Sequence, residues 1–343
     1  MKVLIIGDLH FRDDLSAGYM DAQTDTILRI WRNENPECVV FLGDLFHYRK
    51  PNPEVLLKIK YLLQVISNRS VVHVVVGNHD QSTKADDGTT ALSLFENERT
   101  TIWNSPGDDF EWGFSFIPCF ENEKTIIKCL EDVPDDFTLF GHFAFSGSLN
   151  SVGSYDFSIP LSCARNSGFL GHIHKYSVES IGGGDLSTPE KNLIFLGTPY
   201  PTMFSEAGQK HYYATLEGER FNWETNIKTI DFGIQYIDIP SSKLDKFKKK
   251  IFDEDYYTLL RVHMQAYENI ISDAMIEELS KISHVEYVYD PLINEDEISD
   301  YDADDQVTLV DDSLISEYVK GQSSDIDTDI LLKGLELLKK NEY

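Results

Sequence analysis

The stretch VVVGNHDQS, residues 74–82, carries three valines directly into Gly77-Asn78-His79-Asp80. The valines are typical of a buried strand, and the abrupt change at Gly77 marks the end of that strand. Two interpretations fit the polar residues that follow. Gly-Asn is a favourable turn pair, and His and Asp are tolerated in loops. Alternatively, amide oxygens and imidazole nitrogens both bind divalent metal ions. The stretch alone does not distinguish a turn from a metal site.

The same pattern, an apolar run that ends in Gly and is followed by a metal-capable side chain, occurs four more times. The other instances are Val3–Ile6 before Gly7-Asp8-Leu9-His10, Cys38–Leu42 before Gly43-Asp44, Phe137–Phe140 before Gly141-His142, and Phe169-Leu170 before Gly171-His172-Ile173-His174. Each instance taken singly is explained by a turn or a hydrogen-bonded edge residue. Because open α/β sheets place ligands at the carboxyl ends of strands, the five together predict one shared site.

Strands and helices alternate in the first half of the chain, which predicts an α/β layered fold. Helical patterns cover Asp21–Asn33 and Glu54–Ser67, between the first three strands. Further strand-like runs at Phe114–Ile117 and Leu193–Leu196 have less helix between them. The later part of this domain, residues 1–232, is therefore expected to hold a mixed sheet.

Three more segments follow. Residues 233–294 alternate strand and helix patterns and predict a small α+β domain. Residues 295–312 hold nine acidic residues and no Lys or Arg, and such like-charge runs predict a linker. Residues 313–343 predict two short amphipathic helices. Their apolar faces either bind a groove on a partner or pack on each other or on residues 233–294.

The bulk composition limits the class of protein. The chain has 343 residues, 41% of them hydrophobic, and a net charge of -28, which opposes non-specific adhesion to nucleic acid or anionic membrane. Its four scattered cysteines predict free thiols in a reducing compartment. The N-terminal apolar run is too short for a signal peptide or a membrane span, so a cytoplasmic protein with no membrane association is expected.

The constellation resembles the calcineurin-like metallophosphoesterases, whose pattern is D-x-H, G-D, G-N-H-D/E, a lone His and G-H-x-H in this order. The resemblance implies a four-layer sandwich of two sheets flanked by helices, with two divalent ions at the strand ends. One ion would be held by Asp8, His10 and His174, and the other by Asn78, His142 and His172, with Asp44 bridging both. Mn²⁺ is the expected metal, and Mg²⁺ is the alternative.

His79 carries no assigned metal in this scheme. Its position beside Asn78 suits a general acid that protonates the leaving oxygen, with Asp80 orienting its ring. The alternative is that His79 only hydrogen-bonds to a ligand. His47, three residues after Asp44, is expected at the rim of the site, where it would place the end of the substrate or, alternatively, support Asp44.

Further segments resemble the SbcD-type nucleases of double-strand-break repair, the meiotic-recombination-eleven nucleases, and most of all their bacteriophage members. The segments are GDLFH at 43–47 with Pro51, GHIHK at 171–175, and FLGTPYPTMFSE at 195–206. After residue 233 the resemblance is one of architecture only. It implies a capping domain at 233–294, and a helical tail at 313–343 that docks on a coiled-coil ABC-type ATPase.

The resulting hypothesis is a DNA exo- and endonuclease that acts in recombination and repair as the subunit of an ATPase–nuclease complex. A homodimer through the apolar helix Glu54–Ser67 is also expected. The candidate DNA contacts are Arg12, Arg49, Lys50, Lys175 and the basic run 243–250, which equally fits a solvated helix face. The alternatives are a phosphatase or cyclic-nucleotide phosphodiesterase on the same scaffold and, from another class, a non-catalytic adaptor that recruits the ATPase.

Overall fold

The computed structural model describes residues 1–15, 18–148, 158–181, 191–265, 271–282 and 284–290. The expected acidic linker and helical tail, together with residues 291–294 of the expected capping domain, lie outside the described residues. The described chain through Asp290 forms one compact unit. The domain boundaries proposed from the sequence stay a prediction.

The first of two large sheets holds the N-terminal strands. Its order is β12-β11-β1-β2-β3-β4, with β1 to β4 parallel, β11 antiparallel to β1, and β12 antiparallel to β11. The strands are β1 (Lys2–Ile6), β2 (Cys38–Phe41), β3 (Val71–Val75), β4 (Thr100–Trp103), β11 (His211–Glu219) and β12 (Asn222–Ile230). The β1 to β3 runs are buried on both faces, which explains their continuous apolar sequence.

The second sheet is mixed, as expected. Its order is β5-β6-β7-β8-β10-β9, with a parallel centre and an antiparallel strand at each edge. The strands are β5 (Gly107–Asp109), β6 (Phe114–Ile117), β7 (Thr138–Gly141), β8 (Gly168–Leu170), β9 (Ser177–Ile181) and β10 (Lys191–Phe195).

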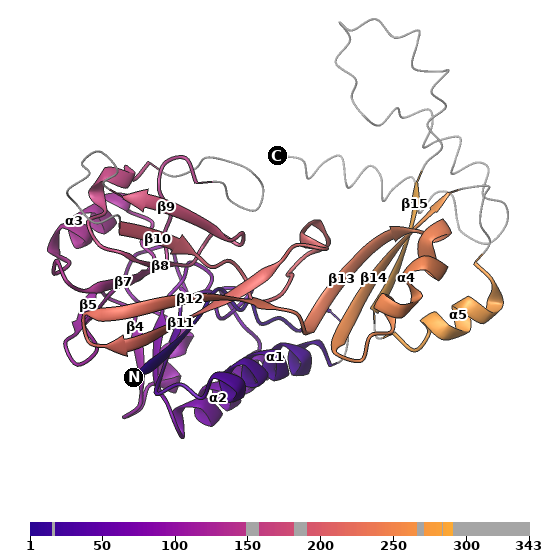
Figure 1. Ribbon diagram of the computed structural model, residues 1–343, viewed down its shortest axis with the longest axis horizontal. Coiled ribbons are helices and arrows are strands. Elements are labelled where there is room, and N and C mark those ends of the chain that lie inside the picture. Colours follow the sequence, from indigo (N-terminus) through magenta and orange to yellow (C-terminus); the bar gives the residue numbers. More distant parts are fainter. Residues whose placement is uncertain (16–17, 149–157, 182–190, 266–270, 283, 291–343) are drawn as a thin grey trace, which may run out of the picture. The chain divides into compact units, whose positions relative to one another are not determined.

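Helices cover the outer faces of the two sheets, and this four-layer arrangement confirms the predicted fold class (Figure 1). On the first sheet lie α1 (Tyr19–Glu34) and α2 (Pro53–Ser67), and on the second lies α3 (Glu123–Asp132). The core between the sheets is built from β-branched residues of one and aromatic residues of the other, such as Val40 and Phe116. Short 3₁₀ turns span Ala91–Phe95 (η1), Leu161–Cys163 (η2), Phe204–Glu206 (η3) and Ser241–Lys243 (η4).

Helix α2 is explained by a capped N-terminus and by an apolar face that packs on the first sheet. The Asn52 side chain accepts a hydrogen bond from the Val55 backbone N–H at 2.9 Å, and Pro53 occupies the first turn, where it has no donor to lose. The buried stripe faces the first sheet: Val55, Ile59, Leu62, Leu63 and Ile66. Leu57 and Tyr61 remain 66% and 52% exposed. Most of the apolar surface that suggested a dimer is therefore buried within the chain itself.

A parallel three-stranded sheet follows, with the order β13-β14-β15. Its elements are β13 (Gly233–Pro240), α4 (Leu244–Ile251), β14 (Tyr256–Gln265), α5 (Asp273–Leu279) and β15 (His284–Asp290). Successive side chains along each strand point to opposite faces of this sheet, so the two faces pack against different neighbours. Tyr236 and Leu259 join the core of the first sheet and its helices, whereas Ile237 and Leu260 pack with residues of α4 and α5. The Tyr236 hydroxyl lies 3.4 Å from that of Tyr19 in α1.

The strands β11 and β12 were not predicted from the sequence. Their hairpin consists of two nine-residue strands, one largely buried and one half-exposed, so it lacks the continuous apolar run that reveals β1 to β3. All four cysteines are free, and Cys38 is buried. Among the residues that the structure describes, no helix combines the length and apolar character needed to cross a membrane.

A buried histidine in β3 predicts a pH-dependent stability. Burial lowers the pKa of His73 to about 4, and the Asp109 carboxylate offsets only part of this. The unfolded imidazole titrates near ~6.5. The unfolded chain therefore binds more protons between these values, and the free energy of unfolding should fall as the pH decreases from about 6.5 toward 4.

Urea unfolding at pH 7 and pH 5 checks this for the wild type and His73→Gln. The variant should lose less of its unfolding free energy between the two pH values, because it lacks the titrating ring. The same substitution at half-buried His284 in β15 is the control. An unchanged pH slope in His73→Gln would contradict the prediction.

Candidate metal centre

The strand ends of both large sheets supply the candidate site. Asp8 and His10 follow β1, Asp44 follows β2, and Asn78 follows β3. The remaining three predicted ligands come from the second sheet, with His142 after β7 and with His172 and His174 after β8. Each of the two groups of strands is parallel, so their carboxyl ends lie at one edge of each sheet.

The structure brings all seven predicted ligands together. Donor atoms of Asp8, His10 and His174 lie within 4.8 Å of one another, as do those of Asp44, His142 and His172. Asn78 belongs to the second group, because its Oδ1 is 3.0 Å from Nε2 of His142 and 2.7 Å from Nδ1 of His172.

Asp44 lies between the two groups, as a bridging ligand requires. One carboxylate oxygen, Oδ2, is 3.8 Å from Nε2 of His10 and 3.4 Å from Nε2 of His142. The other, Oδ1, accepts a hydrogen bond of 2.7 Å from the His79 backbone N–H. The carboxylate is therefore fixed by the turn after β3 while it faces both groups.

Several predicted ligands are preceded by a glycine, because other groups approach that position too closely for a side chain. A Cβ on Gly77 would overlap the Asp44 carboxylate, and one on Gly43 would overlap the His142 ring. A Cβ on Gly171 would collide with the Asp8 carboxylate. Sharp turns accompany these contacts, because His10, Asp44 and His172 have φ angles of 46°, 47° and 79°. Non-glycine residues rarely adopt this left-handed region, and such strain concentrates at functional sites.

Hydrogen bonds fix which imidazole nitrogen faces the site. The Nδ1–H of His142 donates to the Leu42 carbonyl at 2.7 Å, which leaves Nε2 toward Asp44. Nδ1–H of His174 donates a hydrogen bond of 3.2 Å to the Glu206 carboxylate, and Nε2 then faces Nε2 of His10 at 2.9 Å. Metal-binding histidines typically donate their other ring N–H to a carbonyl or carboxylate in this way.

The electrostatics of the cluster favour a cation. Burial lowers the pKa of His142, but the Asp44 and Asp8 carboxylates outweigh burial and raise the pKa to about 10. Burial and the neighbouring His142 lower the pKa of His172 to about 3, which keeps its ring in the neutral form that binds metals. Among the described residues, Oδ1 of buried Asp8 has no hydrogen-bond partner. Buried carboxylates that lie beside imidazole nitrogens and an amide oxygen, and that raise the pKa of His142, fit divalent metal ions.

His79 lies beside the cluster, and a hydrogen bond at Nδ1 fixes the orientation of its ring. Its Nδ1–H donates to the His47 carbonyl at 2.6 Å, and its ring centroid is 5.1 Å from that of His10. A donor atom of His79 also lies within 4.8 Å of donor atoms of His10 and Asp44. It can thus present Nε2 to a bound substrate.

The predicted role of Asp80 is wrong. Its carboxylate accepts hydrogen bonds of 3.0 Å from the backbone N–H groups of Phe46 and Gly77 and does not contact the His79 ring. The physical reason is the tight turn after β3, which turns Asp80 inward to tie this turn to the one after β2. Burial and the charge of Asp44 raise the pKa of Asp80 to about 8. Asp80 therefore supports the turns, and the His47 carbonyl orients His79.

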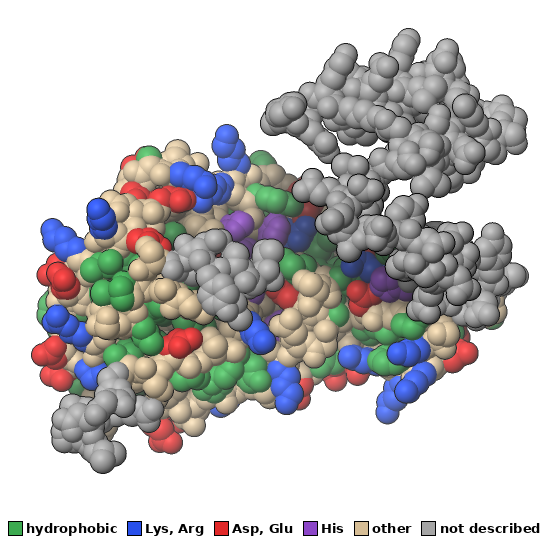
Figure 2. Space-filling model, turned by 90° about the horizontal axis from the view of Figure 1, so that it is seen from above, with side chains coloured by type: hydrophobic (Ala, Val, Ile, Leu, Met, Phe, Trp, Pro, Cys, Tyr) green, Lys and Arg blue, Asp and Glu red, His purple; other side chains and the backbone are tan. Residues whose placement is uncertain are grey.

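His47 lies at the rim of the cluster, half-buried. Its ring lies edge-on to those of His10 and Tyr48, with centroids 5.4 Å and 4.6 Å away. Its backbone N–H donates to Phe11 at 3.0 Å. Figure 2 shows histidine side chains reaching the surface on this face of the molecule.

Sequence reasoning missed the role of Glu206. The FSE segment was recognised, but no role followed from it, because its contact to His174 spans 32 residues. Glu206 is 5% exposed, and its second oxygen accepts hydrogen bonds from the N–H and hydroxyl of Thr202 at 2.6 and 3.1 Å. Gln23 of α1 was also missed. It donates to the His10 carbonyl at 3.1 Å and so steadies the first strand end.

The sequence of residues 1–176 matches the calcineurin-like phosphoesterase family, and this match spans more than half of the chain. This chain belongs to that family. The ligand cluster described above lies at the carboxyl ends of the matched strands, and the family explains its composition. This phosphoesterase is thus a metal-dependent phosphoester hydrolase with a site for two divalent ions.

Solved structures similar to this phosphoesterase include a nuclease and a phosphatase. The Pseudomonas putida nuclease MPE is 13% identical, with a TM-score of 0.33 over 65% of this chain and 87% of the other. A dimetal phosphatase from Danio rerio is 14% identical, with a TM-score of 0.36 over 67% of this chain and 98% of the other. These similarities are too low to bear on activity. No curated protein sequence matches the chain.

Glu206→Ala should lower the affinity of the phosphoesterase for metal at Asp8, His10 and His174. The expected loss is roughly 10- to 100-fold, the usual effect of removing a carboxylate that orients a metal-binding histidine. Isothermal calorimetry with Mn²⁺ measures it, and Glu206→Gln should recover part of the affinity by keeping an acceptor for His174.

The matched control is Glu34→Gln. Glu34 is also a buried carboxylate, but it pairs with Lys2 and Lys228 at 2.6 and 2.8 Å. This control should reduce stability and leave metal affinity unchanged. Equal metal affinity in Glu206→Ala and the wild type would assign Glu206 to packing alone.

Proposed function

We propose that this phosphoesterase is a DNA nuclease, an exonuclease on double-stranded ends and an endonuclease on single strands. It would act in recombination and double-strand-break repair as the subunit of a complex with a coiled-coil ABC-type ATPase. The observation that carries the proposal is the complete seven-ligand cluster with an additional oriented imidazole, His79, beside it. The segments at 43–47, 171–175 and 195–206 support DNA as the substrate, because they resemble SbcD-type nucleases. Two of these segments hold candidate ligands, and the third holds Glu206.

In this proposal, seven residues bind the two metal ions and His79 acts as the general acid in phosphodiester cleavage. Asp8, His10 and His174 would hold one ion, and Asn78, His142 and His172 the other, with Asp44 shared. When bound, such a pair of ions activates water and neutralises charge on the transferred phosphoryl group. His79, fixed through the His47 carbonyl, donates a proton from Nε2 to the leaving oxygen. Mn²⁺ is the proposed metal, and the host bacterial cytoplasm is the proposed location.

The charge distribution predicts that the protein alone binds DNA weakly. The net charge is -28, and two of the candidate contacts are neutralised. Arg12 pairs with Asp14 at 2.5 Å, and Arg49 pairs with Glu121 at 3.1 Å. In the basic run 243–250, Lys248 pairs with Glu278 at 2.6 Å. Lys50 and Lys175 remain exposed beside the site. The proposed ATPase and the metals would therefore supply most of the affinity.

Two partner surfaces belong to the proposal. The ATPase would dock on residues 313–343, and a second copy of the chain would pair through α2, where Leu57 and Tyr61 are exposed. Deleting residues 313–343 should abolish co-purification with the ATPase but keep metal-dependent cleavage of short DNA. Light scattering at tens of micromolar protein measures the dimer.

The activity is tested by incubating linear duplex DNA with the protein and Mn²⁺, with and without the ATPase. Degradation from the ends supports the nuclease. Hydrolysis of a small chromogenic diester without any DNA cleavage would instead favour the phosphatase or cyclic-nucleotide phosphodiesterase. Binding of the ATPase without hydrolysis of either substrate would favour the adaptor.

His79→Ser should reduce nuclease turnover by about 10²- to 10⁴-fold, the usual cost of losing a general acid, while both metals stay bound. Single-turnover cleavage of an oligonucleotide measures the rate, and calorimetry measures the metals. Loss of a metal in this variant would place His79 among the ligands and overturn its role as a proton donor.

His47→Ser should impair end degradation more than cleavage of flexible single strands. The reason is its rim position, where the half-buried ring lies against Tyr48 and, in this proposal, beside the DNA end. Rates on a blunt duplex and on a single-stranded oligonucleotide, measured side by side, decide this. An equal loss on both substrates would show that His47 only supports His79 or Asp44.

A further inference from the structure

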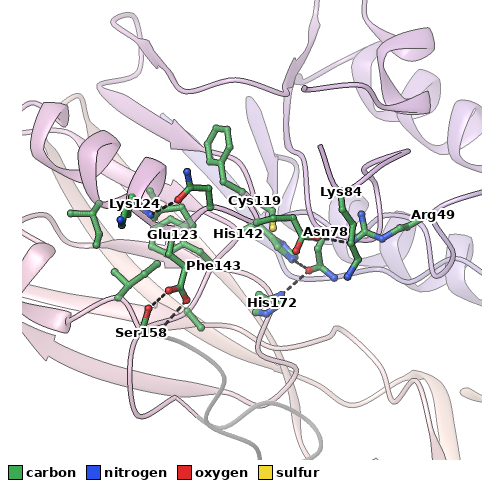
Figure 3. Close-up of a pocket in the computed structure, with 17 residues that line it drawn as sticks. Arg49, Asn78, Lys84, Cys119, Glu123, Lys124, His142, Phe143, Ser158 and His172 are labelled. Atoms are coloured by element: carbon green, nitrogen blue, oxygen red, sulfur yellow. Dashed lines mark hydrogen bonds and ion pairs between the residues drawn. The ribbon is translucent and has the colours of Figure 1, made fainter. Parts of the chain in front are cut away.

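A cavity of about 750 Å³ lies directly beside the metal-ligand cluster (Figure 3). Asn78, His142 and His172, one of the two predicted ligand sets, form one of its walls. Whatever occupies the cavity is therefore next to the phosphorus atom that reacts. The volume falls within the range of roughly 300–1,000 Å³ that is usual for small-molecule sites.

Much of the remaining lining of the cavity is apolar. Helix α3 contributes Ile126 and Ile127, and the segments after β6 and β7 contribute Phe120 and Phe143. Phe120 and Ile127 are only half-buried, so they present open apolar surface to the cavity. Hydrolysis of a phosphodiester does not itself need such a surface, which instead fits a flat, apolar ring.

Cations border the cavity in a chain that is otherwise strongly acidic. Arg49, Lys84 and Lys124 all line it. Of the two acidic side chains there, Glu121 is paired with Arg49 at 3.1 Å, and Glu123 accepts a hydrogen bond of 3.0 Å from the Ser158 N–H. Within the described part of the chain, Lys84 and Lys124 form no ion pair. They are available to a phosphate.

We infer that this cavity holds the base of an unpaired nucleotide adjacent to the scissile phosphate, with the next phosphate near Lys84, which lies on the same side of the cavity as Asn78 (Figure 3). The inference rests on the proposed nuclease function and names the nucleotide-binding part of that site. A base that is paired and stacked within a duplex cannot enter such a pocket, so the nucleotide must first leave the helix. The cavity would thus favour single strands and frayed ends over intact duplex.

The inference is tested with short single-stranded oligonucleotides that contain one abasic residue. Cuts by the Mn²⁺-loaded, full-length protein are mapped, and kcat/KM is measured at one defined cut while the abasic residue is moved along the strand. On one side of the cut, removing the adjacent base should lower kcat/KM by about tenfold, in the range of base-stacking contributions. On the other side, the same change should have little effect.

Phe120→Ala links this base dependence to the cavity. The variant should cleave the normal strand about tenfold less efficiently and no longer distinguish it from the abasic strand. Phe110→Ala is the matched control, because Phe110 is an exposed phenylalanine outside the cavity and its variant should behave as the wild type. Persistent discrimination against the abasic strand in a folded Phe120→Ala protein would overturn the assignment of the base to this cavity.

The dependence of wild-type kcat/KM on the position of the abasic residue tests the inference even if Phe120→Ala does not fold. DNA cleavage that is indifferent to the abasic residue at every position would overturn the inference and leave the nuclease function standing. Hydrolysis of a chromogenic diester with no cleavage of any DNA would instead overturn the proposed function on which the inference depends.

Discussion

The close approach of the turns after β2 and β3 to the His142 ring is the constraint on which the site depends. Side chains at Gly43 and Gly77 would overlap His142 and Asp44, so the two sheets can meet at this point only through glycine. Asp44 completes the contact with its left-handed backbone, which turns the carboxylate between the two ligand groups.

The sandwich core maintains that approach. Each strand that delivers a ligand is anchored in apolar layers, with Ile5 of β1 and Phe140 of β7 in the same buried cluster between the sheets. A rigid scaffold allows polar and charged groups to be held out of water, which is costly unless they are paired. The turns supply such partners. Backbone N–H groups donate to the Asp80 carboxylate, and a backbone carbonyl accepts a hydrogen bond from His142.

The surroundings of the cluster divide into sides with different chemistry. Glu206 holds His174 from behind on one side, and the packing of Tyr236 and Leu259 joins the three-stranded sheet to the layer that includes α1. His47 and His79 lie together beside His10 and form a rim of imidazole rings. The apolar cavity adjoins Asn78, His142 and His172. A phosphoester at the centre would therefore meet imidazole rings at the rim and an apolar pocket near Asn78, His142 and His172.

Local sequence patterns were sufficient to predict the scaffold and the seven candidate ligands, because each strand and the residues that follow it are contiguous in the chain. Doubly buried strands such as Val3–Ile6 are continuous apolar runs, and each ligand follows its strand within a few residues. The amphipathic hairpin β11–β12 carries no such run, and its place beside β1 follows only from tertiary pairing.

Contacts between residues far apart in sequence followed from the folded arrangement and from no local pattern. The tertiary structure showed that Asp80 binds the backbone of Phe46, that the His47 carbonyl orients His79, and that Glu206 orients His174. It also showed that most of the apolar side of α2 is covered within the chain. Periodicity and motif spacing report which face a residue occupies and which chemistry it offers, but hydrogen-bond partners depend on how the turns fold over one another.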